Sequence, residues 1–100
     1  MALDHEHFMN IALEHSRKAA AAGDGPVGSV IVRDGKIVAE GGNRVYTDLD
    51  PTAHGEVVVI REASRKLNTV ELSGCTLYTA MEPCPMCCWA IIVAGISQLA

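Results

Sequence analysis

The stretch GSVIVRDGKIVAEGG, residues 28–42, carries the strongest folding signal in the sequence. Two runs rich in β-branched residues flank Asp34-Gly35, a dipeptide that suits the positive backbone angles of a tight hairpin turn. The pattern predicts antiparallel strands near residues 27–33 and 36–41. Because an isolated hairpin is only marginally stable in water, other elements must cover its apolar residues.

Helical patterns on both sides of the hairpin supply those covering elements. Apolar residues recur at helical spacing through residues 3–22, and Gly23 predicts the end of that helix. Asp50 suits an N-cap and Pro51 suits the first helical position, so a second helix is predicted to begin there. The elements expected after the hairpin are a helix from Asp50-Pro51 to about Leu67, a strand at 75–80 and a helix from Pro85 to about Ala94.

The order of these elements predicts one α/β domain over residues 1–100. A helix, a hairpin, a helix, a strand and a helix are followed by GISQLA, which reads as the start of another strand. A mixed sheet with helices on both faces, in three α-β-α layers, is the packing that buries all the apolar surfaces. Because the sequence stops on an apolar strand start, we expect the C-terminal part of the domain to be missing.

Composition narrows the class of protein. A net charge of −4 and a pI near 5.4 argue against the broad basic surface of a nucleic-acid-binding protein. No apolar run is long enough to span a membrane, and the first ten residues, MALDHEHFMN, lack the apolar core of a signal peptide. We therefore expect a cytoplasmic protein. In that reducing compartment a C-x-x-C motif binds a metal or acts in redox chemistry more often than it forms a structural disulfide.

The segment MEPCPMCCWA, residues 81–90, contains such a motif at the start of a predicted helix. Cys84 and Cys87 are three residues apart, which places them on one helix face about 5–6 Å apart at Cβ. They could form half of a zinc site or a redox dithiol. Cys75 and Cys88 are more typical of small core residues.

His54 is the best candidate among the histidines to complete a metal site. His5, His7 and His15 fall on the first helix, where solvent or the apolar stripe accounts for them. His54 stands near the start of the second helix, two residues before Glu56. A Cys₂His group with an open fourth position is typical of catalytic rather than structural zinc.

The two motifs together, His54-Gly55-Glu56 and then Pro83-Cys84-Pro85-Met86-Cys87, form the H-x-E and P-C-x-x-C signature known for zinc deaminases. The sequence resembles the cytidine/deoxycytidylate deaminase superfamily, in its branch of nucleobase (guanine or cytosine) deaminases and tRNA adenosine deaminases. The resemblance implies a cytidine-deaminase-like fold, zinc on His54, Cys84 and Cys87, and a homodimer. It implies that Glu56 is the catalytic proton carrier.

The resemblance also implies which residues contact the substrate. Asn43 matches the family position whose side-chain amide bonds the base, although it equally suits a turn after Gly41-Gly42. Val27, Ala53 and Pro83 would shape the pocket. The expected activity is hydrolysis of an exocyclic amine of a nucleobase or nucleoside to a carbonyl, with release of ammonia.

The substrate is less constrained than the chemistry. PTAHGE and EPCPMC resemble guanine deaminases, HGE and AGI resemble fungal-type cytosine deaminases, and PVG with the EPC loop fits tRNA adenosine deaminases. Guanine deaminases carry an aromatic residue where this chain has Val27 and another near Val93, and this chain lacks both. Trp89 replaces a small residue of the branch, and is interpreted as core or pocket wall. The acidic charge favours a free base or nucleoside over tRNA.

Three alternatives from other classes remain open at this point. A non-catalytic zinc-stabilised module would have no use for Glu56. A thiol redox protein would leave His54 and Glu56 unexplained. An inactive fragment would bind metal without turnover.

Overall fold

The computed structural model of the protein describes residues 4–100. Its elements, in chain order, are α1 (His5–Ala21), β1 (Gly28–Arg33), β2 (Lys36–Gly42), α2 (Gly55–Leu67), β3 (Cys75–Thr79), α3 (Pro85–Ala94) and β4 (Gln98–Leu99). Within this part of the chain, no helix combines the length and the apolar character that crossing a membrane requires.

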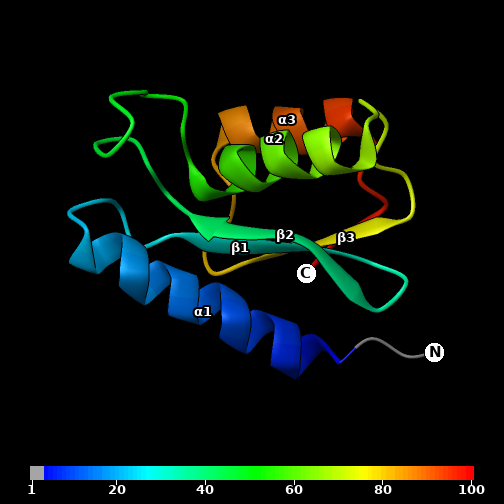
Figure 1. Ribbon diagram of the computed structural model, residues 1–100, viewed down its shortest axis with the longest axis horizontal. Coiled ribbons are helices and arrows are strands. Elements are labelled where there is room, and N and C mark those ends of the chain that lie inside the picture. The colour runs from blue at the N-terminus through cyan, green and yellow to red at the C-terminus, as the bar shows by residue number, and fades with distance from the viewer. Residues whose placement is uncertain (1–3) are drawn as a thin grey trace.

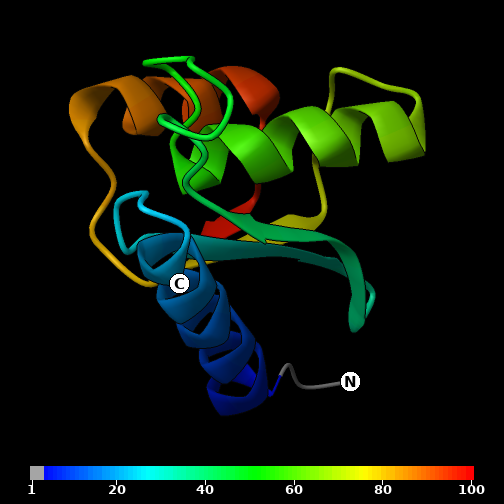
Figure 2. The same cartoon turned by 60° about the vertical axis from the view of Figure 1, so that its left-hand side comes forward.

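The elements form three layers around one sheet (Figure 1). α1 lies against one face of the sheet, and α2 and α3 lie side by side over the other, an arrangement that a rotated view also shows (Figure 2). The strand order is β2-β1-β3-β4. β1 pairs antiparallel with β2 and β3, whereas β3 and β4 are parallel. This confirms the predicted three-layer α/β fold with a mixed sheet and an antiparallel hairpin.

The hairpin forms as its sequence predicts. Asp34 and Gly35 have φ angles of 53° and 75°, the positive values that a tight turn of this kind requires. β1 and β2 begin and end within one residue of the predicted bounds. Their register shifts between Ile31 and Val32, so the ladder contains an irregularity at that point.

The core consists of two clusters, one on each face of the sheet, because side chains alternate along each strand. In β1, Val30 and Val32 face α1, whereas Ile31 faces α2 and α3. The cluster under α1 comprises Phe8, Ala12, Val30, Val32 and Tyr78. The cluster under α2 and α3 comprises Ile31, Val38, Ala39, Val59, Ala63, Leu72, Cys75, Leu77, Ile91 and Ala94.

Gly28 allows α1 to approach the start of β1 closely. A side-chain carbon at Gly28 would collide with the carbonyl oxygen of Ala12. Without one, the Gly28 N–H donates to the Ser16 hydroxyl at 2.9 Å. α1 therefore fixes the point at which the chain enters the sheet, directly after Val27.

The predicted start of the second helix at Asp50-Pro51 is wrong. α2 begins at Gly55, and His54 is its N-cap. The Asp50 carboxylate instead accepts hydrogen bonds from the N–H and hydroxyl of Thr52, at 2.9 and 2.7 Å. It also accepts one from Arg61 of α2 at 3.1 Å. Asp50 thus closes a local turn in the loop before the helix, the other common use of an aspartate at such a position.

Candidate metal centre and active site

The N-termini of α2 and α3 supply the side chains of one site. His54 is the N-cap of α2 and Cys84 is the N-cap of α3, and both have extended backbone angles. In the described chain, neither side chain caps its own helix. Cys87 follows in the first turn of α3. All three side chains are therefore available to a common ligand.

The ligand atoms of these residues lie close together. The sulfur atoms of Cys84 and Cys87 are each 3.6 Å from Nδ1 of His54. Each pair of ligand atoms in the group is within 4.8 Å, and no other such group occurs among residues 4–100. One imidazole nitrogen and two sulfurs are a donor set that suits zinc, and three protein ligands leave a fourth position open.

Burial raises the pKa of one of the two cysteines. Cys87 is fully buried, and this burial, with the nearby Glu56 carboxylate as the next cause, raises the pKa of its thiol to about 12. Without a metal the group is thus a neutral thiol. Because zinc binds the thiolate, binding would release that proton.

Glu56 is the charged residue next to this group. It lies in the first turn of α2, is only 3% exposed, and acts on the pKa of Cys87. Its Oε1 atom has no hydrogen-bond partner in the described part of the chain. A buried carboxylate oxygen without a partner is unfavourable unless a ligand or water completes it. Glu56 therefore fits a site that holds a metal and a polar reactant.

Asn43 follows directly after β2. Its N–H donates to the carbonyl oxygen of Val27 at 2.8 Å, and its Oδ1 accepts from the N–H of Val45 at 3.0 Å. The turn role predicted for Asn43 is confirmed by these contacts. They also fix the orientation of the side chain, whose Nδ2 lies toward Gly25.

The other predicted pocket residues lie on the segments around the group. Val27 is half-buried at the end of the turn before β1. Ala53 is fully buried beside His54, and its carbonyl oxygen accepts from the N–H of Arg44 at 2.8 Å. Pro83 is half-buried, and its carbonyl oxygen accepts from Cys88 Sγ at 3.5 Å.

The chain matches the family described as the cytidine and deoxycytidylate deaminase zinc-binding region over residues 3–100. It belongs to the cytidine and deoxycytidylate deaminase family. This membership agrees with the metal group in the fold, because the family is defined by zinc binding.

Two kinds of characterised relative are similar to this member of the family. The tRNA-specific adenosine deaminase of Aquifex aeolicus is 43% identical over 94 residues, which cover 94% of this chain and 62% of the relative. The guanine deaminase of Bacillus subtilis is 50% identical over 90 residues, which cover 89% of this chain and 58% of the relative. The chain thus spans about three fifths of the length of these relatives.

Solved structures give the same two kinds of neighbour. A structure from work on A-to-I editing by tRNA:A34 deaminases superposes with a TM-score of 0.94, at 43% identity, and covers 96% of this chain and 74% of its own. The X-ray structure of the B. subtilis guanine deaminase gives a TM-score of 0.93 at 47% identity, and covers 97% of this chain and 62% of its own. The cytidine-deaminase-like fold is therefore shown.

Some sequence-based interpretations differ from the structure of this deaminase-family chain. Trp89 is 67% exposed, so its interpretation as a core residue is wrong. It lies on an outer face of α3 with Ile92 and Val93, which are also exposed. The prediction of a buried Cys75 is confirmed, whereas Cys88 is only half-buried.

The histidines of α1 do not join the metal group. His15 Nε2 lies 2.8 Å from Glu40 Oε1, and His5 Nδ1 lies 2.6 Å from the Tyr78 hydroxyl. His7 is exposed.

The described structure also has a groove of about 520 Å³. It runs along the outer edge of β2, between α1 and α2, and none of the three metal-group residues lines it. Asn43 lines one end of it together with Asp24 and Thr47. Sequence reasoning missed Asp24, whose only local signal is its position in the turn sequence Gly-Asp-Gly-Pro.

Proposed function

We propose that this chain is the catalytic domain, residues 1–100, of a zinc-dependent hydrolytic deaminase. It replaces an exocyclic amine of a nucleobase or nucleoside, of guanine or cytosine type, with a carbonyl group and releases ammonia. The observation that carries the proposal is the buried Glu56 beside the group of His54, Cys84 and Cys87, with a carboxylate oxygen that has no hydrogen-bond partner among residues 4–100. A structural zinc site or a redox dithiol has no need of such a carboxylate.

In this proposal His54, Cys84 and Cys87 hold the zinc. Zinc held in this way supplies Lewis acidity, which activates water at neutral pH. The ligands come from two helix N-termini that the core holds in place, so the group is organised by the fold rather than by a flexible loop.

Glu56 is the proposed catalytic acid and base. Its carboxylate accepts a proton from the attacking water and delivers it to the ring nitrogen next to the reacting carbon. The water oxygen forms a bond to that carbon. Glu56 then transfers the remaining proton of the water from the new hydroxyl group to the amine, and the C–N bond breaks as ammonia leaves. One water is consumed and one ammonia is formed. Burial keeps the carboxylate apart from bulk solvent, which would otherwise compete for these protons.

Asn43, Val27, Ala53 and Pro83 are the proposed substrate contacts. The hydrogen bond from the Val45 N–H to Oδ1 of Asn43 leaves the Nδ2 end of that amide as the donor to a base. The apolar side chain of Val27 suits the face of a flat heterocycle, whereas the backbone at Ala53, whose side chain is fully buried, and the loop at Pro83 would shape the edge of the pocket.

A free base or nucleoside is the preferred substrate class. The 50% identity to the B. subtilis guanine deaminase and the net charge of −4 support it. A second candidate is adenosine in tRNA, converted to inosine. The 43% identity to the A. aeolicus tRNA-specific adenosine deaminase, over 94% of this chain, favours that candidate.

We further propose a cytoplasmic homodimer. The uncharged helix α3 exposes Trp89, Ile92 and Val93, an apolar surface of the kind that a subunit interface covers.

Ammonia release by the zinc-loaded chain tests the proposal. The substrates are guanine, cytosine, adenine, their nucleosides and a tRNA anticodon stem-loop. Glu56→Ala is expected to retain one zinc per chain and to lower kcat by about 10³-fold. Glu62→Ala, an exposed position on the same helix, is the matched control and keeps wild-type turnover.

The substrate that is deaminated decides between the two candidates. Release from a free base or nucleoside supports the first, and release from the stem-loop alone supports the second. Absence of release from every substrate, with one zinc bound per chain, would contradict deamination of these substrates. It would leave another aminated ring compound as substrate, a zinc-stabilised module or an inactive fragment.

A further inference from the structure

Asp24 is a buried carboxylate that neither the metal group nor the proposed chemistry uses. It lies in the turn between α1 and β1 and is 7% exposed. Its own N–H donates to the carbonyl oxygen of Ala19 at 2.9 Å, which fixes the residue to the C-terminal turn of α1. A buried carboxylate is favourable only when hydrogen bonds replace its lost hydration.

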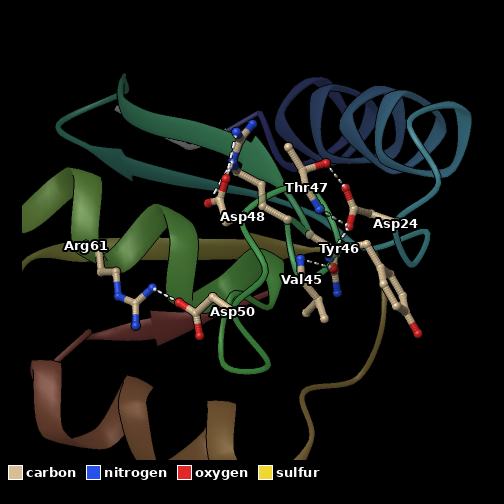
Figure 3. Close-up of polar contacts among 9 residues, drawn as sticks. Asp24, Val45, Tyr46, Thr47, Asp48, Asp50 and Arg61 are labelled. Carbon is tan, nitrogen blue, oxygen red and sulfur yellow. Dashed lines mark hydrogen bonds and ion pairs between the residues drawn. The ribbon is translucent and has the colours of Figure 1, made fainter.

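Those hydrogen bonds come from the loop that follows β2. Oδ1 of Asp24 accepts from the N–H groups of Tyr46 and Thr47, at 2.7 and 3.3 Å, and Oδ2 accepts from the Thr47 hydroxyl at 2.5 Å (Figure 3). We call Asp24, Tyr46 and Thr47 the Asp24 cluster. The hydrogen bond from the Thr47 hydroxyl is the largest cause that lowers the pKa of Asp24, so the group is a carboxylate at neutral pH. The two halves of the cluster are more than 20 residues apart in the sequence, so the contact is tertiary.

The loop held by this cluster, residues 43–54, connects two parts of the candidate site. It begins at Asn43, the proposed substrate contact, and ends at His54, in the metal group. Its two ends are joined by the hydrogen bond from the Arg44 N–H to the Ala53 carbonyl. The ion pair between Asp50 and Arg61 attaches the loop to α2, also seen in Figure 3.

The loop is attached to the turn of residues 24–27 at two points. One is the backbone hydrogen bond from Asn43 to Val27, and the other is the Asp24 cluster. With both points present, the turn of residues 24–27 fixes the position and the rotation of the loop. With the cluster removed, only the first of these two attachments, the hydrogen bond from Asn43 to Val27, would remain, so the loop could shift relative to that turn.

We propose that Asp24 is a positioning residue, which holds the 43–54 loop in the conformation that presents the Asn43 amide to the substrate. The part of this inference that concerns substrate rests on the proposed function, whereas the part that concerns the loop does not. Asp24 touches no proposed ligand or reacting atom, so its effect on turnover passes through Asn43.

Two substitutions of Asp24 separate its hydrogen bonds from its charge. Asp24→Ala removes all three acceptor contacts. Asp24→Asn keeps a carbonyl oxygen for the two N–H groups, and its amide can donate to the Thr47 hydroxyl. Val32→Ala is the control for general stability. Val32 is buried in the cluster under α1, so its truncation lowers stability without removing a contact of the loop.

Steady-state kinetics, zinc content and amide hydrogen exchange are measured on the zinc-loaded chain and its variants. The substrate is the one that the wild type deaminates. Asp24→Ala is expected to raise KM about tenfold with kcat within about twofold of wild type, because a binding contact is lost in ground and transition state alike. Asp24→Asn is expected to have a KM close to that of the wild type. Val32→Ala is expected to lower the melting temperature and leave KM unchanged.

Amide exchange tests the loop without substrate. In the wild type the amides of Tyr46 and Thr47 are expected to be protected, and Asp24→Ala to reduce that protection by at least about tenfold. All variants are expected to bind one zinc per chain. A wild-type KM in Asp24→Ala, or a raised KM that Val32→Ala reproduces, would overturn the proposal.

A wild type that deaminates nothing would refute the proposed function alone. Amide exchange would then decide the present inference, because equal protection of Tyr46 and Thr47 in the wild type and Asp24→Ala would overturn it and selective loss would support it.

Discussion

The N-terminus of α1 and the N-termini of α2 and α3 begin their helices in different ways. At α1, Asp4 is an ordinary N-cap whose carboxylate accepts from the N–H of His7 at 3.0 Å. At α2 and α3 the N-cap residues are His54 and Cys84, and in the described structure their side chains form no such bond. These two side chains approach one another instead, with sulfur and nitrogen 3.6 Å apart.

The difference shows where side chains serve stability and where they serve the site. A good N-cap typically contributes about 1 kcal/mol to a helix. α2 and α3 lack that contribution, and other features offset part of it. Pro85 at the first helical position of α3 has no N–H to satisfy, and both helices pack their buried residues onto the sheet. An uncapped helix start in a well-packed fold is thus a sign that its N-cap residue has another partner.

The strongest test of this contrast compares the loss of Cys87, a proposed zinc ligand, with the loss of the neighbouring Cys88, which is not a proposed ligand. Cys87→Ser is expected to weaken zinc binding by more than about 100-fold, because a neutral hydroxyl replaces a thiolate. Competition with a chromophoric chelator measures the affinity. Cys88→Ser is the matched control at the neighbouring position, and its hydroxyl can keep the bond to the Pro83 carbonyl. Equal affinities in the two variants would contradict the assignment of Cys87 as a ligand.

A substitution that gives α2 an ordinary N-cap should raise the free energy of unfolding and abolish zinc binding. His54→Asn places a good N-cap at the start of α2, and we expect the metal-free protein to gain about 1 kcal/mol in free energy of unfolding. Zinc binding and turnover should be lost together. Urea denaturation of the metal-free wild type and variant measures the gain. A metal-free variant less stable than the wild type would show that His54 supports the fold by itself.

The smallest effect is expected at the ordinary cap. Asp4→Ala removes the hydrogen bond to His7, and we expect a loss of about 0.5–1 kcal/mol in free energy of unfolding, with zinc content and KM unchanged. Thermal denaturation with and without zinc gives the difference. Asp4→Asn retains a side-chain oxygen and should behave as wild type. A loss of zinc in Asp4→Ala would remove the distinction between the two kinds of helix start.

Elements with strong local signals could be predicted closely. The observed bounds of α3, Pro85–Ala94, are the predicted ones, because proline begins that helix and Gly95 ends it. The Asp34-Gly35 turn likewise depends on the backbone preferences of two residues. The start of α2 could not be predicted in this way. Asp50 can cap a helix or close a turn, and its contacts with Thr52 and Arg61 select the turn.

The sequence by itself determined the hairpin, the three-layer class and the residue types of the metal group. These follow from short-range rules: backbone preference, periodicity, and the spacing of thiol, imidazole and carboxylate groups. Only the tertiary structure decided that two helix starts more than 25 residues apart meet within bonding distance. It also left Trp89 exposed and placed Asp24 under the 43–54 loop. Such contacts depend on how the layers pack, and a local stretch of sequence does not encode the distance between residues remote along the chain.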